Sequence, residues 1–154
     1  MSKLGKKSAH IFQYNFDIVI NRRVEDVWPQ LFGGIDAWWP KEYRALGENS
    51  QMSFGEAVGS LLLETGEKGE ALEWYRTQMI VPGQSLYLVG SLAPDWGGPT
   101  TSMLKLMFNN TDSSCVLNVS DALLGNVSEA SAKSAESGWV DIFESGFKDF
   151  VEGG

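Results

Sequence analysis

Side chains that commonly perform catalysis or bind metals are scarce in this sequence. It contains one histidine, His10, and one cysteine, Cys115. A Ser-His-Asp triad would have to use His10, and no pattern marks a partner serine. One cysteine and one histidine do not complete a zinc site, and the glycines follow neither dinucleotide-binding nor Walker spacing. The sequence therefore predicts no metal site, no cofactor and no nucleophilic triad, and Cys115 is expected to be a small buried apolar residue.

The other polar candidates lie on segments with strand-like patterns. Arg76 alternates on one face with Trp74, so an inward Arg76 could bind a carboxylate or polarise a carbonyl. If the opposite face, which carries Tyr75, is the buried one, Arg76 is solvated instead. Glu73 and Asp121 would act as acid or base only if burial raised their pKa, and the solvated alternative is favoured for both. This shortage of chemistry favours a binding protein over an enzyme.

Two adjacent tryptophans, Trp38 and Trp39, are the most unusual local feature. They stand in a short segment that ends at Pro40, in a chain with six tryptophans and 12% aromatic residues. Adjacent residues of a helix point about 100° apart. We therefore expect one indole to fill the core and the other to face the mouth of a cavity.

Two further tryptophans allow more than one interpretation. Trp96 precedes Gly97-Gly98 in a long loop. It could cap a cavity entrance, fix the loop to the surface, or form the contact of a homodimer. Trp139 lies on an apolar stripe at helical spacing, where a core position is favoured over a ligand-facing one.

Charge and hydropathy limit the classes of partner. The formal net charge is −8, which repels phosphate backbones, so no nucleic-acid partner is predicted. No apolar run reaches the roughly 18–20 residues that a membrane span needs, and the first residues lack the apolar core of a signal peptide. These features predict a cytoplasmic protein without membrane insertion. We expect a flexible lead-in over residues 1–9 and a single domain over residues 10–152.

The hydrophobic pattern predicts an α+β protein. Apolar residues alternate over 10–20, which is typical of a strand with one buried face. A helical stripe over 24–31 follows, ended by Gly33-Gly34, and a second short helical turn reaches Trp39. Pro29 is expected to kink or shorten the first helix. Strands with short connections, typical of an antiparallel meander, are predicted from Phe54 onward over 59–66, 70–81, 85–92, 102–110 and 115–124.

The longest predicted helix covers 126–151, with Ser128 as its N-cap. Gly138 and Gly146 lie within it, where each costs about 1 kcal/mol relative to alanine. Two such glycines suggest that the backbone needs room, either for packing or for a ligand.

Four segments, in this order of elements, resemble one known superfamily. "VINRRVEDVWPQL" carries Glu25, Val27 and Trp28 at the entry to the first helix. "AWWP", "PGQSLYLVGSLAP" and "SGWVDIFESGFKDFV" follow, and together they cover nearly the whole chain. The sequence resembles the SRPBCC, or START-like, superfamily of birch-pollen allergens and polyketide cyclases, in a branch similar to heat-shock ATPase activators. The resemblance implies a helix-grip fold, in which a curved antiparallel sheet of about six or seven strands wraps around a long C-terminal helix.

The resemblance also implies a cavity between sheet and helix that holds a small apolar molecule such as a lipid, polyketide or hormone. A cyclase- or dehydratase-type enzyme and a chaperone-associated partner module are the alternatives. The residues expected to contact the ligand are Trp38, Trp39, Phe54, Leu63, Trp74, Arg76, Leu88, Trp96, Leu104, Phe108, Leu117, Trp139 and Phe143.

Overall fold

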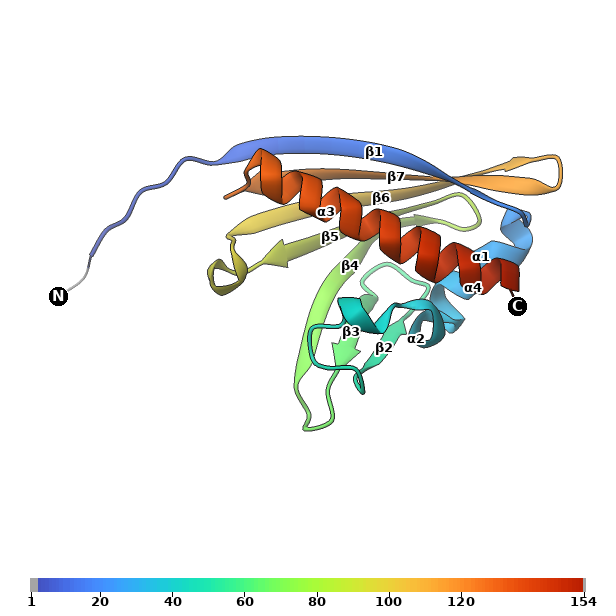
Figure 1. The fold of residues 1–154 in the computed structure, drawn as a ribbon, viewed down its shortest axis with the longest axis horizontal. Helices are drawn as coiled ribbons and strands as arrows, with labels where there is room; N and C mark the ends of the chain where they lie inside the picture. The colour runs from blue at the N-terminus through green and yellow to red at the C-terminus, as the bar shows by residue number, and fades with distance from the viewer. Residues whose placement is uncertain (1–2, 154) are drawn as a thin grey trace.

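The computed structural model describes residues 3–153, in which seven strands precede one long helix (Figure 1). The strands are β1 (His10–Ile20), β2 (Gln51–Phe54), β3 (Leu61–Thr65), β4 (Ala71–Val81), β5 (Ser85–Leu92), β6 (Thr100–Thr111) and β7 (Ser114–Gly125). The segments between β1 and β2 are the helices α1 (Val24–Gly33) and α2 (Ile35–Trp38) and the 3-10 turn η1 (Lys41–Tyr43). A second 3-10 turn, η2 (Pro94–Trp96), lies between β5 and β6.

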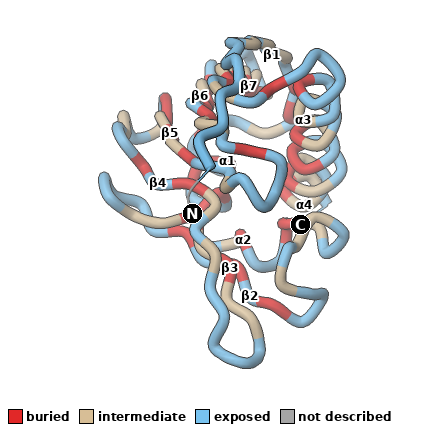
Figure 2. The backbone as a smooth tube through the Cα atoms, turned by 90° about the vertical axis from the view of Figure 1, so that its left-hand side faces the viewer, coloured by how far each residue is buried: buried red, intermediate tan, exposed pale blue. Residues whose placement is uncertain are grey.

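All seven strands form one antiparallel sheet in the order β1-β7-β6-β5-β4-β3-β2. Strands β3 to β7 form the expected meander; β2, which lies before the predicted strands, extends it at one edge, and β1 adds to the other edge beside β7. The sheet is strongly curved, and the C-terminal helix crosses its concave face (Figure 1). Buried segments concentrate where helix and strands face one another (Figure 2). The predicted α+β helix-grip architecture is confirmed.

The C-terminal helix runs without interruption through α3 (Glu129–Asp141), a π-helical segment η3 (Ile142–Lys148) and α4 (Asp149–Gly153). Ser128 caps it as predicted, because its Oγ accepts a hydrogen bond of 3.1 Å from the backbone N–H of Ser131. The helix begins at Glu129, three residues later than expected, since a capping residue lies outside the helix that it caps.

The first helix tolerates its proline. Of the two outcomes expected for Pro29, an early end is wrong: α1 continues to Gly33 and is closed by Gly34. Its buried stripe includes Val27, Trp28 and Leu31, as the pattern predicted. Packing of this stripe against the sheet holds the helix together across the missing N–H.

The structure corrects the expectation for the adjacent tryptophans. Trp38 and Trp39 do diverge, but both are buried in aromatic packing, with 4% and 1% of their surface exposed. The Trp38 ring lies 4.9 Å from that of Phe147 on the C-terminal helix. Trp39 lies 5.4 Å from Trp74 and 6.0 Å from Trp139. The core therefore has two aromatic branches at this point, and neither indole lies at a cavity mouth.

The chain before β1 is outside the sheet. Residues 3–9 are exposed and belong to neither helix nor strand, and they extend away from the body of the molecule (Figure 1). The first two residues of the predicted lead-in lie outside the described residues. None of the helices within residues 3–153 is both long and apolar enough to cross a bilayer.

Candidate functional site

A cavity of about 340 Å³ lies between α3 and the concave face of the sheet. Its walls are aromatic: Tyr43, Trp74, Tyr75 and Trp139. Apart from Trp139, the residues of α3 that line it are small: Ser134, Ala135 and Gly138. Small side chains on the helix keep its backbone close to the sheet without filling the space beneath it.

The two glycines of the C-terminal helix have different roles. A Cβ added at Gly138 would meet only the ring of Tyr43, at an ordinary 3.6 Å, and Gly138 lines the cavity. A Cβ added at Gly146 would lie 2.6 Å from the carbonyl oxygen of Trp38 and 3.0 Å from the ring of Pro40. The expectation that these glycines make room thus holds for two separate reasons: space at Gly138 and backbone contact at Gly146.

Two adjacent residues of β4, Trp74 and Tyr75, both line the cavity. Regular alternation would send them to opposite faces of the sheet. The register between β3 and β4 shifts at this point: Leu62 pairs with Tyr75 and Leu63 with Glu73, which leaves Trp74 without a partner. This β-bulge turns two successive side chains inward.

The bulge determines which side chains of β4 point inward. Before it the inner face carries Trp74, and after it the inner face carries the buried residues Tyr75 and Thr77. Arg76 therefore points outward, where its guanidinium pairs with Glu73 at 2.9 Å and both side chains are largely exposed. The solvated alternative for Arg76 and Glu73 is the one that the structure shows.

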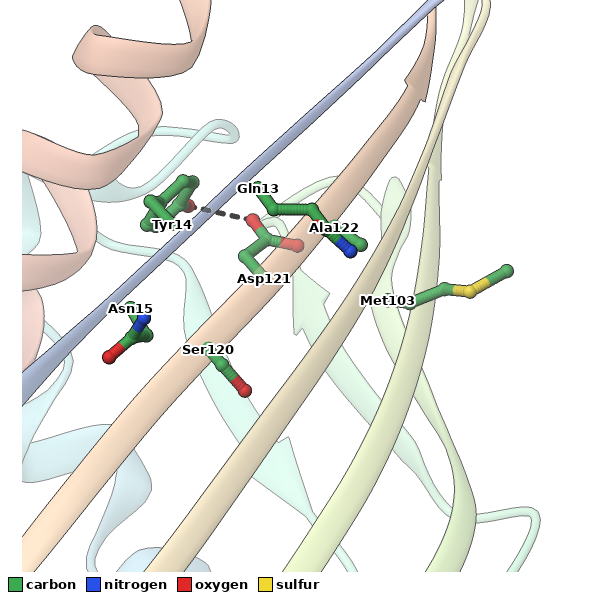
Figure 3. A pocket seen from close by; sticks show the side chains of 7 residues that line it. All are labelled: Gln13, Tyr14, Asn15, Met103, Ser120, Asp121 and Ala122. Carbon is green, nitrogen blue, oxygen red and sulfur yellow. Dashed lines mark hydrogen bonds between the residues drawn. The ribbon is translucent and has the colours of Figure 1, made fainter.

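A row of polar side chains forms the sheet side of the cavity. The Tyr75 hydroxyl lies 2.6 Å from Ser102 Oγ, and Ser102 Oγ donates to Asp121 Oδ1 at 2.8 Å. Tyr14 donates to the other oxygen, Asp121 Oδ2, at 2.7 Å, as Figure 3 shows. The row crosses the sheet from β4 through β6 and β7 to β1, and Ser102 and Asp121 both line the cavity.

Strand β5 lies between β4 and β6, so the tyrosine must cross it to reach Ser102. It does so above Gly90, which is paired with Ser102. A Cβ at Gly90 would collide with the carbonyl oxygen of Trp74 and would lie 2.9 Å from the ring of Tyr75. Glycine at this position allows both the bulge and the crossing.

The carboxyl group of Asp121 is the buried titratable group of the cavity, with 4% of the residue exposed. Burial raises its pKa, and hydrogen bonds from Tyr14, Ser102 and the Ala122 backbone only partly oppose the shift. Burial and the nearby Asp121 charge also raise the pKa of Tyr75, which keeps this phenol protonated. The solvated interpretation of Asp121 is wrong, because its side chain is buried beside Tyr14 and Ser102.

A polar hollow of about 290 Å³ lies on the outer face of the sheet behind Asp121. Gln13, Asn15, Ser120 and Met103 contribute to its lining. Met103 points away from the C-terminal helix, whereas Tyr14 and Asp121 point toward one another across β1 and β7 (Figure 3). Tyr14 and Asp121 also line this outer hollow, so Asp121 borders both the hollow and the inner cavity.

A second buried carboxylate, Glu64, has a different environment. It accepts hydrogen bonds from the backbone N–H groups of Ala45 and Leu46, from Ser50 Oγ and from Trp74 Nε1, at 2.7–3.0 Å. Burial alone would raise the pKa of Glu64, but these four donors outweigh it and hold the pKa below its usual value. Glu64 orders the loop before β2 and fixes the orientation of the Trp74 indole.

The structure places the thirteen predicted contact residues in three settings. Trp74 and Trp139 line the inner cavity. Arg76 points outward, Leu63 is half-buried and Trp96 is 58% exposed. The others are buried in the apolar core, away from the cavity lining: Trp38, Trp39, Phe54, Leu88, Leu104, Phe108, Leu117 and Phe143.

Trp96 lies beside a second hollow, of about 470 Å³, outside the aromatic cavity. Leu46 and Leu72 line this hollow, which shares Trp74, Ser91 and Leu92 with the lining of the inner cavity. A capping role and a homodimer contact for Trp96 both stay predictions.

Sequence reasoning missed the polar residues of the cavity, Tyr75 and Ser102, and left Asp121 in solvent. Gly90 within a strand was the available signal, since an interior glycine often marks a bulge or a close approach. Among residues 3–153, no group of three or more histidine, cysteine, aspartate or glutamate side chains is arranged to hold a metal ion.

No family model and no curated protein sequence matches the chain. Its fold is nevertheless similar to solved structures over almost its whole length. An uncharacterized protein from Rhizobium leguminosarum is 13% identical, with a TM-score of 0.71 over 96% of this chain and 98% of that chain. Ara h 8.0201 is 12% identical, with a TM-score of 0.70 over 94% and 100% of the two chains.

The Aha1 dimer from Colwellia psychrerythraea is similar as well: 16% identical, with a TM-score of 0.63 over 92% of this chain and 96% of that chain. At these identities the likeness concerns the fold. The chain has the helix-grip fold, and the resemblance that the sequence motifs indicated is confirmed for the fold.

Proposed function

We propose that this protein binds a small apolar or aromatic molecule in the cavity between α3 and the sheet. The observation that carries the proposal is the cavity itself: about 340 Å³, with aromatic walls and a single polar row. Sites for small molecules in proteins are typically concave and mostly apolar, with a few polar groups that fix orientation. The helix-grip fold supports the proposal by placing a helix over a curved sheet, although fold alone does not define function.

The expected affinity follows from the apolar surface that such a ligand would bury. Burial of roughly 200 Å² at about 25 cal/mol per Å² contributes about 5 kcal/mol, before the entropy of association is subtracted. Stacking on the tryptophan and tyrosine rings adds about 1 kcal/mol for an aromatic body. A gross gain of about 6 kcal/mol corresponds to tens of micromolar before that entropy is subtracted, so we expect dissociation constants of about 100 μM or weaker for simple aromatic probes.

The direct test is a fluorescence titration of the purified protein with a neutral apolar probe, N-phenyl-1-naphthylamine. Native mass spectrometry of the same protein would detect a ligand carried through purification. Gly138→Leu should block the site, because its side chain would extend into the cavity from a position that has room for a Cβ. Ser137→Leu is the matched control, since Ser137 is the exposed neighbour on the same helix.

The proposal predicts probe binding by the unaltered protein and by Ser137→Leu, and at least tenfold weaker binding by Gly138→Leu. Equal binding by all three would place the probe elsewhere and count against this cavity. Absence of binding by the unaltered protein would remove the proposal.

A cyclase- or dehydratase-type activity is the second candidate, and Asp121 is the observation that favours it. A buried carboxylate with a raised pKa is a stronger base than an exposed one, and Asp121 lines the cavity beside Tyr75 and Ser102. In an enzyme of this kind, Asp121→Asn would abolish turnover of a bound substrate while probe binding stays within about twofold. Turnover that survives Asp121→Asn would contradict it.

A further inference from the structure

The donors of the polar row are already committed to one another. Ser102 has a single hydroxyl proton, and it is donated to Asp121 Oδ1. The short contact between Tyr75 and Ser102 therefore requires the Tyr75 hydroxyl to be the donor and Ser102 Oγ the acceptor. The Tyr14 hydroxyl likewise donates its proton to Asp121 Oδ2. Each proton of the row points along it toward Asp121, and only lone pairs remain for a ligand.

Two donors on the aromatic walls are also committed to groups outside the cavity. The Tyr43 hydroxyl donates to Asp141 Oδ2 at 2.7 Å, and Trp74 Nε1 donates to Glu64. The serine hydroxyls that line the cavity outside the row are exposed, so they lie at its rim.

The charge of the cavity, like its excess of hydrogen-bond acceptors, disfavours an anionic ligand. Among the residues that line it there is no lysine, arginine or histidine, and Asp121 carries the one carboxylate. Arg76, the side chain that could have neutralised an anionic ligand, pairs with Glu73 on the outer face. A second carboxylate placed against the row would meet like charge and lone pairs at a buried site.

We propose, on the basis of the ligand-binding function above, that the polar end of the ligand is a hydrogen-bond donor held against Tyr75, Ser102 and Asp121. Phenols, alcohols and protonated amines on an apolar or aromatic body fit this arrangement. Carboxylic acids, which are acceptors and are ionised near neutral pH, do not fit it. A buried acceptor without a donor costs free energy, so the row discriminates between ligands of the same shape.

The test uses four probes that share one aromatic body: naphthalene, 2-naphthol, 2-naphthylmethylammonium and 2-naphthoate. Each is titrated calorimetrically into the full-length protein at pH 7. We expect 2-naphthol and 2-naphthylmethylammonium to bind at least tenfold more tightly than 2-naphthoate. Naphthalene should bind with intermediate affinity, because it buries the same rings without a polar group.

Two variants assign the discrimination to the row. Asp121→Asn should reduce the preference for the ammonium probe over the carboxylate probe at least tenfold, since the amide adds a donor and removes the charge. Asp17→Asn is the matched control: it changes net charge equally but lies exposed on β1, where Asp17 accepts a hydrogen bond from Asn118. Tyr75→Phe provides a second variant with Asp121 in place, and it should weaken 2-naphthol while the ammonium preference survives.

The outcomes separate the two proposals. If 2-naphthoate binds as tightly as 2-naphthol while naphthalene also binds, the donor rule is wrong and the cavity still binds apolar molecules. If naphthalene and all three derivatives fail to bind, both proposals fall. An equal loss of discrimination in Asp17→Asn and Asp121→Asn would mean that net charge, and not the row, selects the ligand.

Discussion

The two halves of the C-terminal helix cover the same sheet but differ in what lies beneath them. Under η3 the interior is solid: Phe143 and Phe147 interlock with Trp38, and Gly146 touches its backbone. We name the part of the molecule formed by η3, α1, α2 and the loop over residues 44–50 the filled region. Under α3 the helix presents small side chains over a cavity, which we name the hollow region. One continuous helix can therefore anchor a fold at one end and leave space for a ligand at the other.

One buried carboxylate is associated with each region, and the surroundings of the two carboxylates shift their pKa values in opposite directions. Glu64, in the filled region, is surrounded by four donors that lower its pKa. Asp121, in the hollow region, has a pKa that burial raises. Full satisfaction is what a structural group needs, whereas partial satisfaction leaves a group able to interact with something else.

The largest expected effect is the loss of Phe147, which is fully buried in the filled region. Phe147→Ala should lower the free energy of unfolding by about 3–5 kcal/mol, because the closed packing cannot collapse around the space. In the hollow region the opposite change, Ala135→Leu, should alter stability by less than about 1 kcal/mol. Chemical denaturation measures both, and similar costs for the two variants would erase the distinction between the regions.

Replacement of the two buried carboxylates by amides should have the next effects on the free energy of unfolding. Glu64→Gln should cost about 2–3 kcal/mol, since an amide cannot accept from all four donors. Asp121→Asn should cost less than about 1 kcal/mol, because the amide can still bond Tyr14 and Ser102. Denaturation at pH 7 compares them directly, and a reversed order would contradict the roles assigned to the two groups.

Their dependence on pH should have opposite signs. The folded pKa of Glu64 lies below the ordinary 4.5, so its stabilisation is present above pH 4.5 and is lost as pH falls through the folded pKa. The folded pKa of Asp121 lies above the ordinary 3.8, so its contribution is greatest below pH 3.8 and is lost as pH rises through the folded pKa. Stability curves of each variant against the unaltered protein should show these two slopes.

Alanine substitutions at Gly146 and Gly138 should have smaller effects on stability, and these effects should have opposite signs. Gly146→Ala should destabilise by about 1–3 kcal/mol, because the new methyl group meets backbone that cannot move freely. Gly138→Ala should stabilise by up to about 1 kcal/mol, because alanine favours the helix and the cavity has room for a methyl group. Thermal unfolding of the two single variants is sufficient, and a shift of the same sign for both would show that the regions are packed alike.

A small effect on stability is also expected for Tyr75→Phe. It removes one neutral hydrogen bond, worth about 1 kcal/mol, and leaves the ring above Gly90 and the bond from Ser102 to Asp121 in place. Denaturation should therefore show a modest change, and ligand titration a larger one for donor probes. A loss of several kcal/mol would mean that the polar row is structural, as the Glu64 site is.

Much of the fold could be predicted because its signals are local. Alternation over 10–20 identified β1, the stripe through Val27 and Trp28 identified α1, and Ser128 marked the start of the last helix. Each of these depends on residues within one or two turns of one another. The resemblance to the superfamily then supplied the order of the elements.

The candidate site could not be predicted in the same way. Continuous alternation along β4 would place Trp74 and Arg76 on one face, but the bulge at Trp74 reverses the alternation, which brings Tyr75 inward and sends Arg76 outward. Asp121 looked like a solvated residue because a short polar side chain between apolar ones does not reveal what covers it. A bulge and a cover are properties of pairing and packing between distant segments.

The sequence alone determined the first strand, the antiparallel meander that follows residue 54, the short helices and the long capped helix with two glycines that need room. These follow from hydrophobic periods and backbone preferences, which act between near neighbours. Tertiary structure decided that both Trp38 and Trp39 are core, that one glycine faces a cavity and the other a carbonyl, and that a chain of hydroxyls ends on a buried carboxylate. Such features depend on which residues meet across the sheet, and a one-residue shift in strand register is enough to exchange them.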